Sequence, residues 1–445
     1  MNRIYNPITS ARRHIVPIVF SLICVLSIIL ADQPGSFVIN EAFSRVTRNS
    51  ILILSLIIPV ICGMGLNFSI VLGAMAGEIG LIMITHWRIE GIGGIMIAFV
   101  IATVISVILG YLTGRLFNKV KGQEMIAGLI LGYFAIGIYD LIFMVMVGTI
   151  IPMYDPVIMI GVNQADGTTT YQGLALTINL LKNTKYALDN LLSINFLDAL
   201  PLLITMNLAV AVGLYLFKLL LKKCDRKASL HPAIYFVMVS VILFILKVLI
   251  SSNKAVYAMF FILKIPVATW IVIILVCLFI VYITKTKLGQ DIRAVGQNIN
   301  VAVAAGIKVD RTRIIATILS TMIAAWGQIV FLQNIGTIQT YYSHEQVGIY
   351  AVAAILVGGA SIEKATIGHV FTGAVLFHVL FFSTPLAATT LFGNAQLGEY
   401  FRVFFCYGTI AVSLLMFAIK KNSDNKKQRD IEMDFTRTQT GNKGF

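Results

Sequence analysis

Residues 91–113 read GIGGIMIAFVIATVISVILGYLT, with no charged side chain among them. A helix needs about 20 apolar residues to cross the hydrocarbon core of a bilayer, and this stretch is long enough. Eleven other runs are also predominantly apolar. The sequence therefore predicts an all-α polytopic membrane protein of about 10–12 transmembrane helices between residues 14 and 420. The other runs lie near 14–31, 50–66, 68–85, 125–150, 200–221, 233–250, 257–283, 314–333, 347–361, 365–386 and 400–419.

The composition leads to the same class. Apolar residues of the types Ala, Val, Ile, Leu, Met, Phe, Trp, Tyr and Cys make up 58% of the 445 residues, and charged residues only 12%. Soluble domains carry about 25% charged residues, because their surfaces must be hydrated. The mean hydropathy is +0.88. These values exclude a soluble enzyme of several domains.

Two of the apolar runs are interrupted by glycine. The runs 50–66 and 68–85 meet at Asn67. We expect them to form one broken or re-entrant element followed by a helix. The run 347–361 is short and is a second candidate for a re-entrant course. The glycines of the first pair are Gly63, Gly65, Gly73, Gly77 and Gly80.

The charges orient the chain. Lys and Arg number 34 against 20 Asp and Glu, a net charge of +14. With the amino terminus inside, the inner segments hold 24 of the 34 basic residues and the outer segments hold 6, among them Arg45 and Arg48. Inner loops are the basic ones in membrane proteins, so both termini are expected in the cytoplasm. The excess then faces anionic lipid and any inner partner, and nucleic acid is not expected as a partner.

Four segments lie outside the predicted helical core. Residues 1–13 are expected to form a cytoplasmic amino-terminal tail, and the charged residues 421–445 a disordered cytoplasmic tail. Residues 152–199 are a polar outer loop, interpreted as a small extracytoplasmic cap with a helical stretch at 173–192. Residues 284–313 form the longest inner connection. None of the five cysteines falls in the outer loop, so no disulfide framework is expected.

The motifs of membrane enzymes are missing from the sequence. There is no Gly-Lys-Ser or Gly-Lys-Thr, and hence no phosphate-binding loop for nucleotide hydrolysis. His344-Glu345 lacks the second histidine of a zinc-protease helix, and the histidines do not cluster with cysteines. We therefore expect a transport protein that is not an enzyme and binds no metal.

An ion-coupled secondary transporter is the alternative. Such proteins place ionisable residues near the middle of the membrane. Glu78 and Asp140 are the only acidic residues within the apolar runs, and Lys247 is a possible ion-pair partner. A structural role in a hydrogen bond or an ion pair would explain either carboxylate equally well.

The inner connection 284–313 reads TKTKLGQDIRAVGQNINVAVAAGIKVDRTR. Its alanines favour helix, and Gly296 and Gly306 offer helix ends or turns. The pattern predicts two short helices with small side chains at the inner surface. Such an element could enter a groove on a partner, where small residues allow close approach of the backbones. An ordinary interfacial amphipathic helix is the other interpretation.

The same connection resembles the cytoplasmic coupling loop of ATP-binding-cassette (ABC) importer permeases. The closest branch is the one that serves ribose and other simple sugars, nucleosides and, more distantly, branched-chain amino acids. The resemblance extends over about residues 50–150 and 200–420. It rests on Gly289, the run Arg293-Ala294-Val295-Gly296-Gln297-Asn298, Ala302 and Ala305-Gly306-Ile307, and is supported by 63–67, 73–77, 121–124, 324–328 and 352–360.

This resemblance implies a permease subunit in a bacterial inner membrane. Its partners are expected to be a cytoplasmic ABC ATPase, an extracytoplasmic solute-binding protein and a second permease chain, identical or similar. ATP and Mg²⁺ belong to the ATPase, so this chain itself is expected to bind no cofactor. The solute is expected to be a simple sugar such as ribose, or a nucleoside. The residues implied in ATPase coupling are Gly289, Arg293, Ala294, Gly296, Asn298, Ala305 and Gly306.

The solute path is expected among polar groups in apolar, glycine-rich elements. Amide and carboxyl groups suit solutes that carry hydroxyl groups or nucleobases. A hydrogen bond between helices explains each of them as well. The candidates are Asn67, Glu78, Gln328, Gln333 and Asn334.

Overall fold

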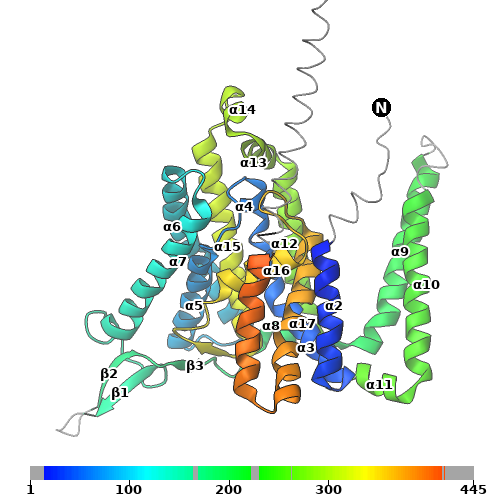
Figure 1. Cartoon of the computed structure of the whole chain (residues 1–445), viewed down its shortest axis with the longest axis horizontal. Coiled ribbons are helices and arrows are strands. Elements are labelled where there is room, and N and C mark those ends of the chain that lie inside the picture. Colours follow the sequence, from blue (N-terminus) through cyan, green and yellow to red (C-terminus); the bar gives the residue numbers. More distant parts are fainter. Residues whose placement is uncertain (1–14, 164–168, 222–229, 262, 413–414, 416–445) are drawn as a thin grey trace, which may run out of the picture.

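The computed structural model describes residues 15–163, 169–221, 230–261, 263–412 and 415. The expected tails at 1–13 and 421–445 lie outside these residues. Helices dominate the described chain, and short strands occur only in the connections (Figure 1). Five helices are long and apolar enough to cross a membrane, namely α6 with Gly91–Lys119, Glu124–Met146, α12 with Val267–Lys285, α15 with Val309–Ile335 and α17 with Ile367–Phe392. The all-α polytopic membrane fold is confirmed.

Shorter apolar helices complete the bundle. They include α2 (Ile15–Ala31), α3 (Gly35–Leu54), α5 (Ile70–His86) and α16 (Val347–Val357). Residues 395–412 form a further helix. Glu124–Met146 consists of α7 (Glu124–Asp140), which continues as the π-helix η1 (Leu141–Met146).

The centre of the bundle is the packing of α5 and α6 on α15. Glycines make this packing close. A Cβ atom on Gly73 would overlap the carbonyl of Thr321, and one on Gly77 would overlap that of Ala325. Small residues at such contacts let two helix backbones approach, which is the main source of packing energy inside a membrane.

The glycine-rich element is broken, as expected. Helix α3 ends at Leu54, the short helix α4 covers Ile57–Ile61, and α5 begins only at Ile70. Between α4 and α5, Gly63 and Gly65 have φ values of +75° and +70°, which a residue with a Cβ rarely adopts. A re-entrant course of this element, or of α16, stays a prediction.

Residues 152–199 differ from expectation. The prediction of a helical stretch at 173–192 is wrong, because only α8 (Ala187–Leu191) is helical there. Strands β1 (Met159–Asn163) and β2 (Thr169–Leu174) form a hairpin that projects from the bundle (Figure 1). Strand β3 (Thr177–Asn179) pairs antiparallel with β6 (Thr337–Gln339), and β4 (Ser193–Asn195) pairs with β5 (Lys264–Pro266). These strands contain Thr, Tyr, Val and Ile, and such β-branched and aromatic residues favour strand over helix.

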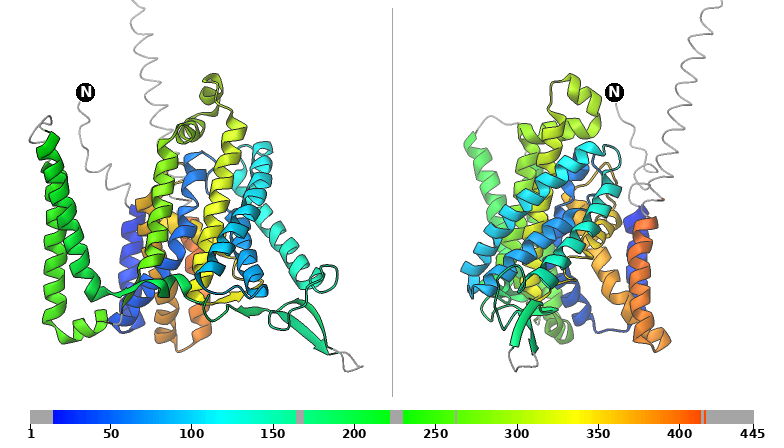
Figure 2. Two further views of the ribbon diagram at one scale, coloured as in Figure 1. Left: turned by 180° about the vertical axis from the view of Figure 1, so that it is seen from behind. Right: turned by 90° about the vertical axis from the view of Figure 1, so that its left-hand side faces the viewer.

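Helices α9 (Phe196–Leu221) and α10 (Leu230–Ser252) form a hairpin that stands apart from the rest (Figures 1 and 2). It packs mainly on itself and is joined to the bundle through α11 (Lys254–Phe261) and the β4–β5 pair. Its exposed Leu, Val, Ile and Phe side chains are those of a lipid-facing surface.

Arg45 and Arg48 lie elsewhere than expected. The sequence places them in an outer segment, but α3 carries both of them into the bundle, where they are half-buried. The segment has no long apolar run, because its polar residues recur along one side of a helix whose other side packs on the core. The helical periodicity of these polar residues was the signal for a helix, and a search for continuous apolar runs misses it.

Candidate functional site

The connection 284–313 contains the two expected short helices, α13 (Lys287–Gln297) and α14 (Ile299–Ala304). The local sequence explains their limits. The Thr286 side chain accepts a hydrogen bond from the Gly289 amide and caps α13. Asn298 ends α13 and caps α14, because its Oδ1 accepts from the amides of Asn300 at 2.9 Å and Val301 at 3.2 Å.

Helices α13 and α14 project beyond the bundle at the end opposite to the β1–β2 hairpin (Figures 1 and 2). Helix α14 exposes aliphatic side chains there. Val301 is 63% exposed, Val303 59% and Ile299 37%. Three exposed aliphatic residues on one short helix form a surface that favours contact with another protein. These residues were not among the sequence candidates, although three aliphatic residues within a polar connection were a visible signal.

Gly296 faces the bundle and not the solvent beyond it. A Cβ atom on Gly296 would overlap the carbonyl of Ile61, at the end of α4. From the other side, a Cβ atom on Gly63 would lie 2.8 Å from the Cα atom of Gly296. The two glycines thus let α13 rest on the turn where the chain breaks between α4 and α5.

The other coupling candidates divide between the two faces of α13 and α14. Gly289 is buried and Ala294 is half-buried, whereas Asn298, Ala305 and Gly306 are exposed. Arg293 is exposed, and its guanidinium donates to the carbonyls of Thr284 and Gly289. The arginine therefore holds the start of α13 while its outer side stays accessible.

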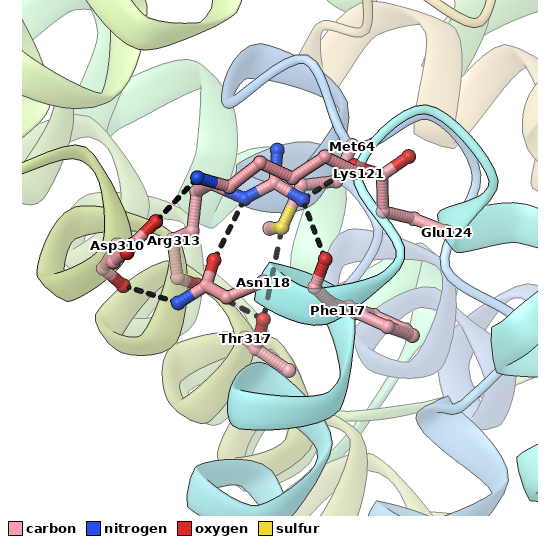
Figure 3. A network of polar contacts seen from close by, with 8 residues as sticks. All are labelled: Met64, Phe117, Asn118, Lys121, Glu124, Asp310, Arg313 and Thr317. Atoms are coloured by element: carbon pink, nitrogen blue, oxygen red, sulfur yellow. Dashed lines mark hydrogen bonds and ion pairs between the residues drawn. The ribbon is translucent and has the colours of Figure 1, made fainter. Parts of the chain in front are cut away.

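A buried ion pair anchors the segment that follows α14 (Figure 3). The Arg313 guanidinium, near the start of α15, is paired with the Glu124 carboxylate at the start of α7. It also donates to the Asn118 side chain at 3.0 Å and to the Phe117 carbonyl at 3.1 Å. Arg313 is 1% exposed, so these partners stabilise its charge in place of water.

Further contacts extend this network (Figure 3). The Lys121 Nζ atom lies 2.7 Å from an Asp310 carboxylate oxygen, and Asn118 donates to the Asp310 carbonyl at 2.8 Å. On the other side, the Thr317 hydroxyl lies 3.8 Å from the Met64 sulfur. The start of α15 is thereby tied both to the α6–α7 connection and to the break before α5.

The five path candidates do not form one cluster. Asn67 is buried, donates to Ser320 at 3.2 Å, and accepts from the amide and hydroxyl of Ser69. It thus holds the start of α5. Gln333 and Asn334 both donate to the Asp189 carboxylate of α8, at 3.1 and 2.8 Å.

Glu78 and Gln328 share a different neighbour, the turn before α16. The His344 Nδ1 atom lies 2.9 Å from a Glu78 carboxylate oxygen, and both side chains are fully buried. Gln328 donates to the carbonyl of Ser343 at 3.1 Å. In the described chain, the partner of Glu78 is thus His344 and not Lys247, which lies on α10.

A cavity of about 270 Å³ lies beside this turn. It is lined by α3, the carboxyl end of α15, β6, the turn 342–346, α16 and α17. Its polar residues include Arg45, Arg48 and Asn49 of α3 and His378 of α17. The described residues that line it include none of the five path candidates, so the sequence analysis missed this cavity.

Known proteins resemble the chain over parts of its length. It is 35% identical over 118 residues to the nucleoside ABC transporter permease protein NupB of Lactococcus lactis, which covers 26% of this chain and 30% of NupB. It is 29% identical over 164 residues to the autoinducer 2 import system permease protein LsrC of Klebsiella pneumoniae, or 36% of this chain and 44% of LsrC. The probable ABC transporter permease protein YphD of Escherichia coli is 33% identical over 101 residues, or 23% and 30% of the two chains.

The matched regions thus span less than half the length of these relatives, and no solved structure is significantly similar to the chain. The family model described as branched-chain amino acid transport system / permease component matches residues 161–417, which is more than half of the chain and includes α13 and α14. The protein therefore belongs to this family of ABC transporter permeases.

Proposed function

We propose that the chain is the transmembrane permease subunit of an ABC importer that moves a small polar solute inward. The solute is a simple sugar such as ribose, or a nucleoside, in line with the nucleoside permease among the relatives. A separate ATPase with its ATP and Mg²⁺ supplies the energy, a solute-binding protein delivers the solute, and a second permease chain completes the path.

One observation carries this proposal. Helices α13 and α14 project from the apolar bundle and expose Ile299, Val301 and Val303. An ATPase groove would bury these side chains, with the exposed Ala305 and Gly306 allowing close approach. The basic residues 285–313 then face the cytoplasm, and both termini lie on that side. The α13–Gly63 contact passes the movement of the ATPase to α5, and the Arg313 network passes it to α6 and α7.

Val301→Asp is expected to uncouple the permease from its ATPase. The side chain is 63% exposed in the isolated chain, so folding should not change, but a carboxylate would be buried unpaired in the docked complex. We expect at least about a tenfold loss of ATP-driven uptake in proteoliposomes. Gln290→Asp, which adds the same charge at an exposed polar position of α13, is the control. Unchanged uptake and unchanged ATPase assembly with Val301→Asp would show that α14 does not dock.

Glu78→Gln tests the proposed path. The amide can still accept a hydrogen bond from His344, so the thermal stability of the purified protein should change little. If the carboxylate contacts solute, uptake falls about tenfold, as expected for loss of one charged hydrogen bond. Uptake equal to that of the unaltered protein removes Glu78 from the path and leaves it a structural role.

An ion-coupled secondary transporter is not favoured, because the related proteins are ABC permeases. The two classes predict opposite results with the purified chain. A secondary transporter moves solute under a proton or sodium gradient without ATP. The permease subunit moves none until the ATPase and the binding protein are added.

A further inference from the structure

The cavity beside α3 has a size suited to a small solute. Its volume of about 270 Å³ is close to the lower end of ligand pockets, which extend from about 300 to 1,000 Å³. It lies between α3 and α17, and Thr337 and Gln339 of β6 also line it. It is thus lined by helices and by a strand that are far apart in the sequence.

The charge of the cavity is positive. Arg45 and Arg48 line it, and the described lining residues include no carboxylate. Glu41, one turn earlier on α3, lies 2.5 Å from the Nε atom of Arg45 but 3.9 Å from Arg48. The Arg48 charge is therefore only partly compensated. An arginine in an apolar bundle is costly to keep, and it commonly marks a substrate path.

Two polar groups at the cavity lack a partner within the described chain. The Nε atom of Arg48 and the Nδ1 atom of His378 are both buried without a hydrogen bond. His378 is 6% exposed and lines the cavity from α17. Buried polar atoms of folded proteins nearly always have a partner, so Arg48 and His378 carry unsatisfied polar atoms beside the cavity.

Aromatic rings provide the other walls. The Arg45 guanidinium lies 5.3 Å from the ring centre of Phe381, and that of Arg48 lies 6.0 Å from Phe331. Tyr350 packs against Phe381 with ring centres 5.1 Å apart. These contacts hold both guanidinium groups in place.

We propose that this cavity is a solute-binding station of the permease, in which Arg48 and His378 hold the oxygen atoms of a hydroxyl-rich, neutral or anionic ring. This rests on the proposed function and names the class of solute. The planar guanidinium matches a pair of neighbouring oxygens, whereas the two positive charges exclude amines and other cations. The station adjoins the turn that contacts Glu78 and Gln328, since Ser343 of that turn lines the cavity.

The test uses the complete complex of permease, ATPase and binding protein in proteoliposomes, with D-ribose and adenosine as probe solutes. Arg48→Gln should lower the maximal uptake rate at least tenfold. The concentration of loaded binding protein that gives half the maximal rate should not change, because the half-buried Arg48 side chain offers little surface to a docked protein. Arg48→Lys keeps the charge but loses the paired geometry of the guanidinium. Its maximal uptake rate should therefore lie between those of the unaltered protein and Arg48→Gln.

Arg115→Gln is the matched control, since Arg115 is an exposed residue of α6 outside the cavity. A second measurement does not depend on the rate. Thr337→Cys places a thiol in the cavity wall, and the probe solute should slow its alkylation in the complex. That protection should disappear when Arg48→Gln is added.

The possible failures are distinguishable. If the unaltered complex takes up neither probe with ATP, the proposed function is wrong for these solutes, whereas protection of Thr337→Cys by solute would still support the station. If uptake occurs and the maximal uptake rate of Arg48→Gln equals that of Arg115→Gln, the proposed solute-binding station is wrong. If the effect of Arg48→Gln vanishes in vesicles without anionic lipid, the cavity holds a lipid phosphate, and the station is equally wrong.

Discussion

Gly296→Val is expected to abolish transport by damaging the permease itself. The new side chain would overlap the carbonyl of Ile61 and the backbone that follows it, none of which is the end of a flexible side chain. Helix α13 must then move away from the turn at Gly63. Overpacking of this kind costs about 1–3 kcal/mol, and here it also breaks the contact between α13 and the break before α5. Uptake in proteoliposomes and thermal stability of the purified permease are the two measurements.

Gly137→Val is the matched control, because Gly137 is also helical and a Cβ atom there would meet open space. The two variants lose the same backbone freedom, so a difference between them reports the contact alone. The comparison with Val301→Asp is equally informative. Gly296→Val should lower stability in the absence of the ATPase, whereas Val301→Asp should act only in its presence. Full stability and full uptake with Gly296→Val would refute the contact.

Arg313→Met is expected to be among the most destabilising single changes in the chain. It leaves the Glu124 carboxylate, 7% exposed, without its cation, and removes the hydrogen bonds to Asn118 and Phe117. Removing one partner of a buried ion pair costs about 3–5 kcal/mol, because the remaining charge is desolvated and unpaired. The purified protein should lose its monodisperse peak in size exclusion at temperatures that the unaltered protein survives.

The double variant Arg313→Met with Glu124→Gln is the control for this mechanism. If the stranded charge is the cause, neutralising it should recover a large part of the lost stability. Lys121→Met, which removes a more exposed pair with Asp310, should cost about 1 kcal/mol or less. A double variant as unstable as Arg313→Met alone would assign the loss to packing and not to charge.

The sequence was sufficient for the fold class and for the two short helices α13 and α14. Apolar length alone identifies α6, α12, α15 and α17, since the bilayer requires long helices whatever their partners. The pair α13 and α14 could also be predicted, because its caps and turns are local: Thr286 and Asn298 act within three residues along the chain. Structure that depends on contacts between neighbouring residues can be inferred from the sequence of that segment.

The cavity and the strands could not be inferred in this way. The same cavity is lined by Arg48, Gln339 and His378 because α3, β6 and α17 pack together. The spacing of residues along the sequence does not predict this packing. The pairing of β3 with β6 joins residues about 160 apart, so neither strand is visible in its own segment. Asn67, Gln333 and Asn334 are polar residues in or beside apolar runs. Their roles depend on the residues that they contact in the fold, and the sequence pattern does not give those contacts.

The β3–β6 pair has a consequence for the free energy of opening the cavity. Thr337 and Gln339 of β6 are part of the cavity wall, while their ladder partners Asn179 and Thr177 belong to the segment that joins the β1–β2 hairpin to α8. Displacing β6 would therefore require either breaking the hydrogen bonds of this short ladder or displacing β3 together with β6. With about 0.5–1.5 kcal/mol for each hydrogen bond, breaking the ladder would cost about a few kcal/mol. Binding of a protein to the β3 segment could offset that cost, and it would then displace the β6 wall of the cavity.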